Sequence, residues 1–238
     1  MSAKFRPSEI KLEALDLPPI LSPVEIGRMD RALLSQMLHD ASQDPDPGNM
    51  FMRLSLLFHS LGSLDLGHEM HARALEHRRI YRYRCARSPT VRLMAIMGPQ
   101  GGLDNAPLEY LLENSDIRLD LVFLDEEGRL PDAIPDHDVA IVGLGESCKN
   151  RGQFERLISD LRSWPRPIIN QPAFVLNCSR DTLYHELKGV PQLVSPQTQR
   201  VMRHAVSVDR FPKIIRPVDS HGGDGLEKID SEGELQRY

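Results

Sequence analysis

Residues 211–229 of the chain read FPKIIRPVDSHGGDGLEKI. The apolar run at 213–215 predicts a strand, the small residues at 220–225 predict a loop, and the alternation at 226–229 predicts a second strand. Strand, glycine-rich loop and strand together indicate a β-hairpin. Glycines reach positive φ and let backbone N–H groups approach an anion closely. The stretch is therefore a candidate cover for a phosphate group, and an ordinary glycine-rich turn is the alternative.

Two basic side chains flank this loop. Arg216 follows the first strand and Lys228 lies in the second, so positive charge stands on either side of the glycines. Phosphate binding would use these two side chains together with the loop at Ser220, His221, Gly222, Gly223 and Gly225. Short glycine motifs also occur often by chance, so the residues alone leave both interpretations open.

The hairpin resembles the phosphate-covering loop of the ATP-grasp superfamily of carboxylate ligases, where a strand of the form F-P-(apolar)2-K-P precedes the glycines. Arg216 stands where those ligases usually carry a lysine on the nucleotide phosphates, which keeps the charge but changes its geometry. Residues 190–198, VPQLVSPQT, are similar to the strand that enters the ATP-grasp domain. Arg180 and Asp181 resemble the D-K pair of the preceding helix, without its lysine.

This resemblance implies ATP and Mg²⁺ as cofactors and a small-molecule carboxylate as substrate. Complete relatives activate the carboxylate as an acyl phosphate, which an amine then attacks. Magnesium needs carboxylates aimed at it, and the chain shows neither a metal site nor an assignable catalytic base. We therefore expect residues 189–238 to be an incomplete ATP-grasp domain, in an N-terminal portion that has no ligase turnover alone; ATP-dependent phosphate release would contradict this.

Composition is that of an ordinary globular protein: 238 residues, of which 40% are hydrophobic and 26% charged. The net charge of −5 does not favour a nucleic-acid partner. No apolar run of about 18 residues and no apolar signal core occur, so we expect no membrane partner. Cys85, Cys148 and Cys178 are widely spaced and odd in number, which favours reduced thiols in the cytoplasm.

The first third of the chain is predicted to be an extended arm over residues 1–22 and a helical region over 23–88. Apolar residues at three- and four-residue spacing predict helices at about 22–38, 49–61 and 64–81. Residues 51–75 resemble one tetratricopeptide unit. Because a solenoid needs about three units, we expect a helical hairpin packed on the next domain.

Two features of this helical region have more than one interpretation. Residues 76–84 are basic with interleaved tyrosines; we expect a solvated helix end, with nucleic-acid contact as the alternative. His68, His71 and His77 are expected to be solvated helix histidines, because a metal site needs more ligands. The hairpin could also bind a protein partner, which makes a non-enzymatic interaction module the alternative function.

From Val91 the pattern changes to strands that alternate with helices, which predicts a parallel sheet with covered faces. The expected strands are 91–98, 119–124, 138–144 and 167–170, and the expected helices are 108–113, 154–161 and one or two within 172–187. Residues 89–188 resemble the Rossmann-like pre-ATP-grasp domain. The fold class predicted for the chain is therefore α/β.

Ligands of such sheets bind beyond the carboxyl ends of the strands. The loop at 98–105 lies there, and Gln100, Gly101 and Asn105 are its candidates for the substrate side. Other polar residues expected at this edge are Glu146, Ser147, Lys149 and Asn170. A small-ligand sensor that uses this edge is a third, weaker hypothesis.

Overall fold

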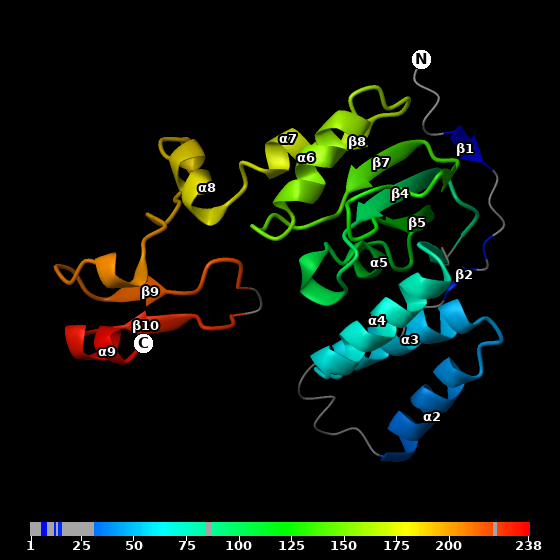
Figure 1. The fold of residues 1–238 in the computed structure, drawn as a ribbon, viewed down its shortest axis with the longest axis horizontal. Helices are drawn as coiled ribbons and strands as arrows, with labels where there is room; N and C mark the ends of the chain where they lie inside the picture. Colours follow the sequence, from blue (N-terminus) through cyan, green and yellow to red (C-terminus); the bar gives the residue numbers. More distant parts are fainter. Residues whose placement is uncertain (1–5, 9–11, 13, 16–30, 84–86, 221–222) are drawn as a thin grey trace. The chain divides into compact units, whose positions relative to one another are not determined.

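The computed structural model describes residues 6–8, 12, 14–15, 31–83, 87–220 and 223–238, and the chain in it is a mixed α/β protein (Figure 1). It forms two compact units. Unit 1 consists of residues 1–145 and 149–175, and unit 2 of residues 146–148 and 176–238. Eight α-helices and a six-stranded, mostly parallel sheet lie within the described residues.

The sheet belongs to unit 1. Its order is β2 (Ala14–Leu15), β3 (Ile80–Tyr83), β5 (Ile117–Phe123), β4 (Val91–Met97), β7 (Val139–Val142) and β8 (Ile168–Ile169). Neighbouring strands are parallel except β3 and β5. The four strands predicted from apolar runs are β4, β5, β7 and β8, so the prediction of a parallel sheet is confirmed.

Helices cover both faces of this sheet because its strands are apolar on both sides. Leu93 and Ala95 of β4 share a core with Met52 and Ala74, which come from α3 (Pro47–Ser60) and α4 (Leu64–His77). Since strand side chains alternate, Met94 lies on the opposite face, where α6 (Arg151–Asp160) is drawn in Figure 1. The other helices of unit 1 are α2 (Arg31–Ser42), α5 (Leu108–Leu111) and α7 (Pro172–Val175).

The start of α3 has a clear physical cause. Asp46 is the N-cap, and its side chain accepts a hydrogen bond from the Asn49 amide at 2.9 Å. Pro47 occupies the first helical position, where its missing N–H costs nothing. The predicted start of the first helix, at about residue 22, lies outside the described residues.

Residues 80–83 differ in structure from the prediction. They form strand β3, so the interpretation of residues 76–84 as a solvated helix end is wrong, and α4 already ends at His77. Tyr81 and Tyr83 are buried on one side of the strand. Arg82 points to the other side, where Asp120 of β5 is its cross-strand partner. The arginine and tyrosine residues thus alternate with the period of a strand.

Three further segments differ from or add to the prediction. The arm contributes two short strands: β1 (Arg6–Ser8) pairs with β6 (Ala133–Pro135), and β2 pairs with β3. β6 lies between the expected strands 119–124 and 138–144, where the sequence predicts neither a strand nor a helix. Residues 190–198, likened to an entering strand, contain neither strand nor helix.

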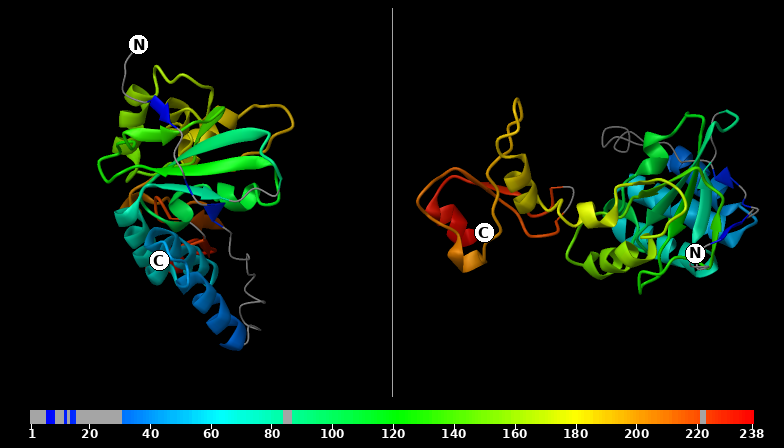
Figure 2. Two further views of the ribbon diagram at one scale, coloured as in Figure 1. Left: turned by 90° about the vertical axis from the view of Figure 1, so that its right-hand side faces the viewer. Right: turned by 90° about the horizontal axis from the view of Figure 1, so that it is seen from above.

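Unit 2 contains the predicted hairpin. Strands β9 (Lys213–Ile215) and β10 (Glu227–Ile229) are antiparallel, and Ile214 lies opposite Lys228. Helix α9 (Glu232–Arg237) follows β10 and lies beside the hairpin in Figure 2. Its N-cap is Ser231, whose hydroxyl accepts a bond from the Glu234 amide. The remaining helix of the unit is α8 (Arg180–Leu187), capped by Ser179.

None of the helices in the described part of the chain is long and apolar enough to cross a membrane.

Candidate functional site

The candidate site is the base of the glycine loop in unit 2. Arg216 follows β9, and its side chain turns back onto the loop's first residue, Ser220. The guanidinium donates from Nε to Ser220 Oγ at 2.9 Å and from Nη2 to the Ser220 carbonyl. Ser220 in turn donates its hydroxyl to the Pro217 carbonyl at 3.0 Å and is buried. Arg216 therefore holds the loop closed at the point where the chain leaves the strand.

A second guanidinium reaches the same place. Arg180, at the start of α8, donates from Nη2 to the Ser220 carbonyl at 3.0 Å, so Arg180 and Arg216 share one acceptor. Within the described residues neither arginine forms an ion pair with a carboxylate. Glu146 interacts electrostatically with Arg180 but forms no ion pair with it, and two positive charges held this close together favour an anion nearby. Sequence reasoning left Arg180 out of the site, although its likeness to the D-K pair was a signal.

A wider polar network surrounds this pair. Arg200 contacts Asp181 at 3.5 Å and donates to the Cys148 sulfur at 3.6 Å. The Cys148 amide donates to Asp219 at 3.0 Å, next to Ser220. Burial raises the pKa of Glu146, and the nearby Asp219 carboxylate adds to this effect. Residues 146–148 therefore belong to unit 2, although they follow strand β7 in the sequence.

The loop itself depends on its glycines. Gly223 and Gly225 both adopt positive φ, +89° and +59°. A Cβ on Gly225 would lie 2.6 Å from Pro217 Cδ, so a side chain there would force the loop open. A Cβ on Gly223 would meet no heavy atom within 4 Å. The two other predicted loop residues, His221 and Gly222, lie outside the described residues.

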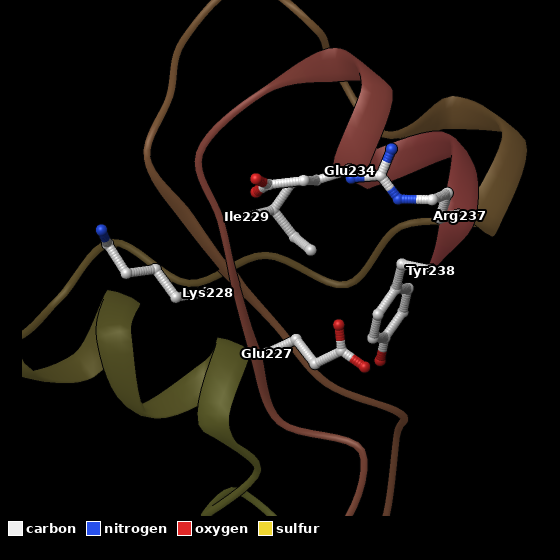
Figure 3. Close-up of a pocket in the computed structure, with 6 residues that line it drawn as sticks. All are labelled: Glu227, Lys228, Ile229, Glu234, Arg237 and Tyr238. Atoms are coloured by element: carbon white, nitrogen blue, oxygen red, sulfur yellow. The ribbon is translucent and has the colours of Figure 1, made fainter.

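Lys228 is placed differently from the two arginines. Its ammonium contacts Asp230 at 2.7 Å, and its side chain is mostly exposed. Figure 3 shows it pointing away from the other residues that line a pocket beside β10. That pocket is lined by Glu227, Lys228, Ile229, Glu234, Arg237 and Tyr238. The Tyr238 hydroxyl donates to the Gly225 carbonyl at 2.8 Å and so fixes the far end of the loop. A phosphate contact from Lys228 remains a prediction.

The predicted substrate-side residues lie in unit 1, in the loop after β4. Asn105 is buried, and its amide nitrogen donates to the carbonyls of Gly98 at 3.1 Å and Gln100 at 2.6 Å. Its side-chain oxygen accepts from the Gly98 amide at 2.6 Å. The Asn105 amide therefore shapes the loop from within. Gly101 lies against the His71 ring.

The loops after β4 and β7 are also joined to each other. The Ala106 amide donates to the Gly143 carbonyl at 2.7 Å, and the Gly145 amide to the Asp104 carbonyl at 2.8 Å. These bonds link the loops that follow β4 and β7, beyond the carboxyl ends of these neighbouring strands, where ligands of such sheets usually bind. The role of Gln100, Gly101 and Asn105 on a substrate side stays a prediction.

The structure gives little support for a metal ion. In the part of the chain that is described, no group of three or more His, Cys, Asp or Glu residues could hold one. These residues therefore form no cluster that could hold a metal ion by protein ligands alone. Of the helix histidines expected in solvent, His71 is instead only 5% exposed, which corrects that prediction. His77 stacks on Phe51 with ring centroids 5.8 Å apart.

No protein-family model matches the chain, and a search of curated proteins finds no match to its sequence.

Proposed function

We propose that unit 2 binds the phosphate groups of a nucleotide, with ATP the expected one, as the phosphate-covering part of an ATP-grasp-like carboxylate–amine ligase. The observation that supports this most is the pair of guanidiniums, Arg180 and Arg216, on the single carbonyl of Ser220. Guanidinium groups match phosphate oxygens in geometry and stay charged. Backbone N–H groups of the glycine loop would supply further donors.

The sheet of unit 1 supports the Rossmann-like part of this proposal. β4 lies in the centre, β5 on one side, and β7 and β8 on the other. The direction in which the chain crosses the sheet therefore reverses next to β4, as in doubly wound folds. Since no cluster of three metal-ligating side chains occurs among the described residues, we propose nucleotide binding alone and no chemical step.

The test is heat stabilisation and titration of the full chain with ATP and ADP. Binding to the folded state raises the free energy of unfolding by RT ln(1 + [L]/Kd) and with it the melting temperature, so weak binding is visible at millimolar nucleotide. Loss of a hydrogen bond to a charged group costs about 1.5–3 kcal/mol. We therefore expect Arg216→Ala and Arg180→Ala each to weaken ATP binding about tenfold or more.

Two further variants separate binding from structure. Arg203→Ala removes one exposed positive charge from the same unit and should leave ATP affinity unchanged. Arg216→Lys keeps the charge that the ligases carry at this place but loses the paired bonds to Ser220. Retained ATP binding in Arg216→Lys supports a phosphate contact. Equal loss in Arg203→Ala and Arg216→Ala would show nonspecific charge attraction and contradict the proposal.

A protein partner for the helical region is the second candidate. Leu64 and Leu66 at the start of α4 are 51% and 46% exposed. Phe51, in contrast, is only partly exposed and packs against the core, so replacing it would test folding rather than binding. We expect a protein captured by the wild-type chain to be lost in Leu64→Ser/Leu66→Ser and kept in Arg216→Ala. Capture that survives the double leucine change contradicts this candidate.

A further inference from the structure

Three histidines of the α3–α4 hairpin gather at one place in unit 1. The rings of His59 on α3 and His68 on α4 meet edge to face, with centroids 5.0 Å apart. His71 lies one turn after His68, is 5% exposed, and meets the Phe123 ring of β5 at 5.0 Å. Phe123 belongs to the sheet core, so this cluster stands between the helical hairpin and the sheet.

The surface that the histidines touch is the loop after β4. A Cβ on Gly101 would lie 2.9 Å from His71 Cγ, and a Cβ on Gly102 would lie 3.1 Å from His59 Nε2. Gly102 also has φ +70°. The backbone of Pro99 accepts a hydrogen bond from His71. The loop at 98–102 thus rests directly on imidazole rings, and glycines provide the space for that contact.

Among the described residues, no carboxylate acts on the pKa of His59 or His71. The Nε2 atoms of His59 and His71 are buried and find no hydrogen-bond partner among the described residues. Burial, together with the neighbouring His59 and His68, lowers the pKa of His71 to about 4. Burial and His68 also lower the pKa of His59. A proton on either ring would therefore place positive charge in an apolar site, beside other imidazoles.

The charged groups on the surrounding elements do not change this balance. On α4, Glu69 pairs with Arg73 at 2.7 Å and Asp65 is exposed. The loop contributes uncharged residues up to its single carboxylate, Asp104, and β5 contributes the Phe123 ring. On α3 the group that faces His59 is Ser55, whose hydroxyl lies 3.3 Å from His59 Nδ1. Within the described residues, the electrostatic influences on His59 and His71 come from histidines.

We propose that His59, His68 and His71 form an acid-sensitive latch, which holds the loop at residues 98–105 against the α3–α4 hairpin at neutral pH and releases it when His59 and His71 take up protons. The same loop is joined to the segment after β7, at the carboxyl edge of the sheet, because its Asp104 carbonyl accepts from the Gly145 amide at 2.8 Å. Its release would open that edge to a ligand. The latch lies in unit 1 and does not depend on nucleotide binding by unit 2.

Amide hydrogen exchange tests the latch in the full chain. Exchange is followed at pH 7.5, 6.0 and 5.0 in peptides from residues 98–106 and from β4, after correction for the intrinsic pH dependence of exchange. For each imidazole that takes up a proton on opening, the equilibrium constant for opening rises by as much as about tenfold for each pH unit below the imidazole's unfolded pKa of about 6.5. We expect loop protection to fall about tenfold or more between pH 7.5 and 5.0, while β4 stays protected.

Variants separate the latch from general acid sensitivity. The pair His59→Gln/His71→Gln cannot take up protons at the buried positions and should keep the loop protected at pH 5.0 relative to pH 7.5. His39→Gln, on the exposed face of α2, should release the loop as the wild type does. Constant loop protection in the wild type, simultaneous loss of protection in β4, or release in the double variant would each overturn the proposal.

Discussion

A single buried carboxylate on β5 joins this strand to its neighbour β3. Asp120 on β5 is 1% exposed and accepts from Arg82 Nε at 2.6 Å and Arg82 Nη2 at 3.0 Å. Arg118 Nε lies 3.3 Å from the same carboxylate. Burying one charge without its partners would cost several kcal/mol, so the two guanidiniums are what permit Asp120 in the core.

Replacing this carboxylate should therefore be costly. Asp120→Asn leaves two guanidiniums without their shared anion, and we expect a loss of about 3–5 kcal/mol in the free energy of unfolding, measured by urea denaturation. The matched control is Asp138→Asn, which also breaks an arginine pair, to Arg92, but at an exposed position. Its loss should be much smaller, because exposed ion pairs contribute little. Equal losses in the two variants would contradict the role given to Asp120.

Two other buried side chains contribute opposite pH dependences to the free energy of unfolding. Burial raises the pKa of Glu109 to about 7, and its Oε2 has no hydrogen-bond partner among the described residues. Burial lowers the pKa of His71 to about 4. Below pH 7 the folded state binds more protons at Glu109 than the unfolded state does, so this group makes stability fall as pH rises from about 4.5 to 7. His71 does the reverse: its contribution is complete above about pH 6.5 and is lost as pH falls toward 4.

Single substitutions should reveal how each of the two side chains changes the slope of the free energy of unfolding against pH. In the wild type the two contributions offset each other between about pH 4.5 and 6.5. In Glu109→Gln we expect the free energy of unfolding to rise with pH across this window, and in His71→Gln we expect it to fall. The measurement is urea denaturation at a series of pH values, which compares slopes and is unaffected by a uniform loss of stability. Parallel slopes in the two variants would show that the assignments are incorrect.

At the scale of elements, the sequence predicts what local pattern determines. Four strands and their helices follow from apolar runs and punctuating glycines and prolines, and the hairpin at β9 and β10 follows from its glycine loop. β3 could not be found this way, because it is stabilised by Asp120, 38 residues later in the chain. β1 and β6 are three-residue strands that pair with each other in a separate two-stranded sheet, so neither is specified by its own sequence. Residues 190–198 lack such a partner strand among the described residues and remain irregular.

The start of α3 allows a test of how much a single helix cap stabilises the protein. The Asp46 side chain caps the Asn49 amide and also pairs with Arg78 at 2.6 Å, which ties the start of α3 to the end of α4. Asp46→Ala should lower the free energy of unfolding by about 1–2 kcal/mol, since a lost N-cap of this kind has that cost.

The next helix supplies the control. Ser63 is the N-cap of α4 but makes no side-chain cap bond, so Ser63→Ala should change stability by no more than about 0.5 kcal/mol. Both variants are compared by urea denaturation under identical conditions. A loss in Ser63→Ala as large as that in Asp46→Ala would mean that residue type, and not the observed bond, decides the cost.

At the scale of the whole molecule, the two units differ in how they are stabilised. Unit 1 has apolar residues buried on both faces of its sheet. In the described part of unit 2, Ile229 is the only hydrophobic residue that is buried. Many of its large apolar side chains are exposed: Val190, Leu193, Val194, Val201, Met202, Val208, Ile214, Val218 and Leu226. An isolated two-stranded hairpin is marginally stable, so unit 2 should open at a lower free energy than unit 1.

The candidate site reflects the same difference. The hairpin, its glycines and Arg216 could be read from the sequence because they are contiguous. The contact between Arg180 and Ser220 joins residues 40 positions apart, and the place of Arg200 beside Cys148 spans 52. Such contacts depend on how irregular segments fold back, which no local pattern specifies. A site held mainly by these long-range bonds, with little apolar core beneath it, is one that a bound anion can stabilise strongly.

Limited proteolysis by a nonspecific protease can test both the weakness of unit 2 and its rescue by nucleotide. We expect the first cuts between residues 188 and 212, where the chain is exposed and has little regular structure, while residues 91–145 stay intact. ATP at millimolar concentration should slow these cuts in the wild type and in Arg203→Ala but not in Arg216→Ala, because only a ligand held by the folded unit reduces its opening. First cuts within the sheet would contradict the assigned order of stability. Cuts in unit 2 that ATP fails to slow in the wild type would leave that order standing and contradict nucleotide binding.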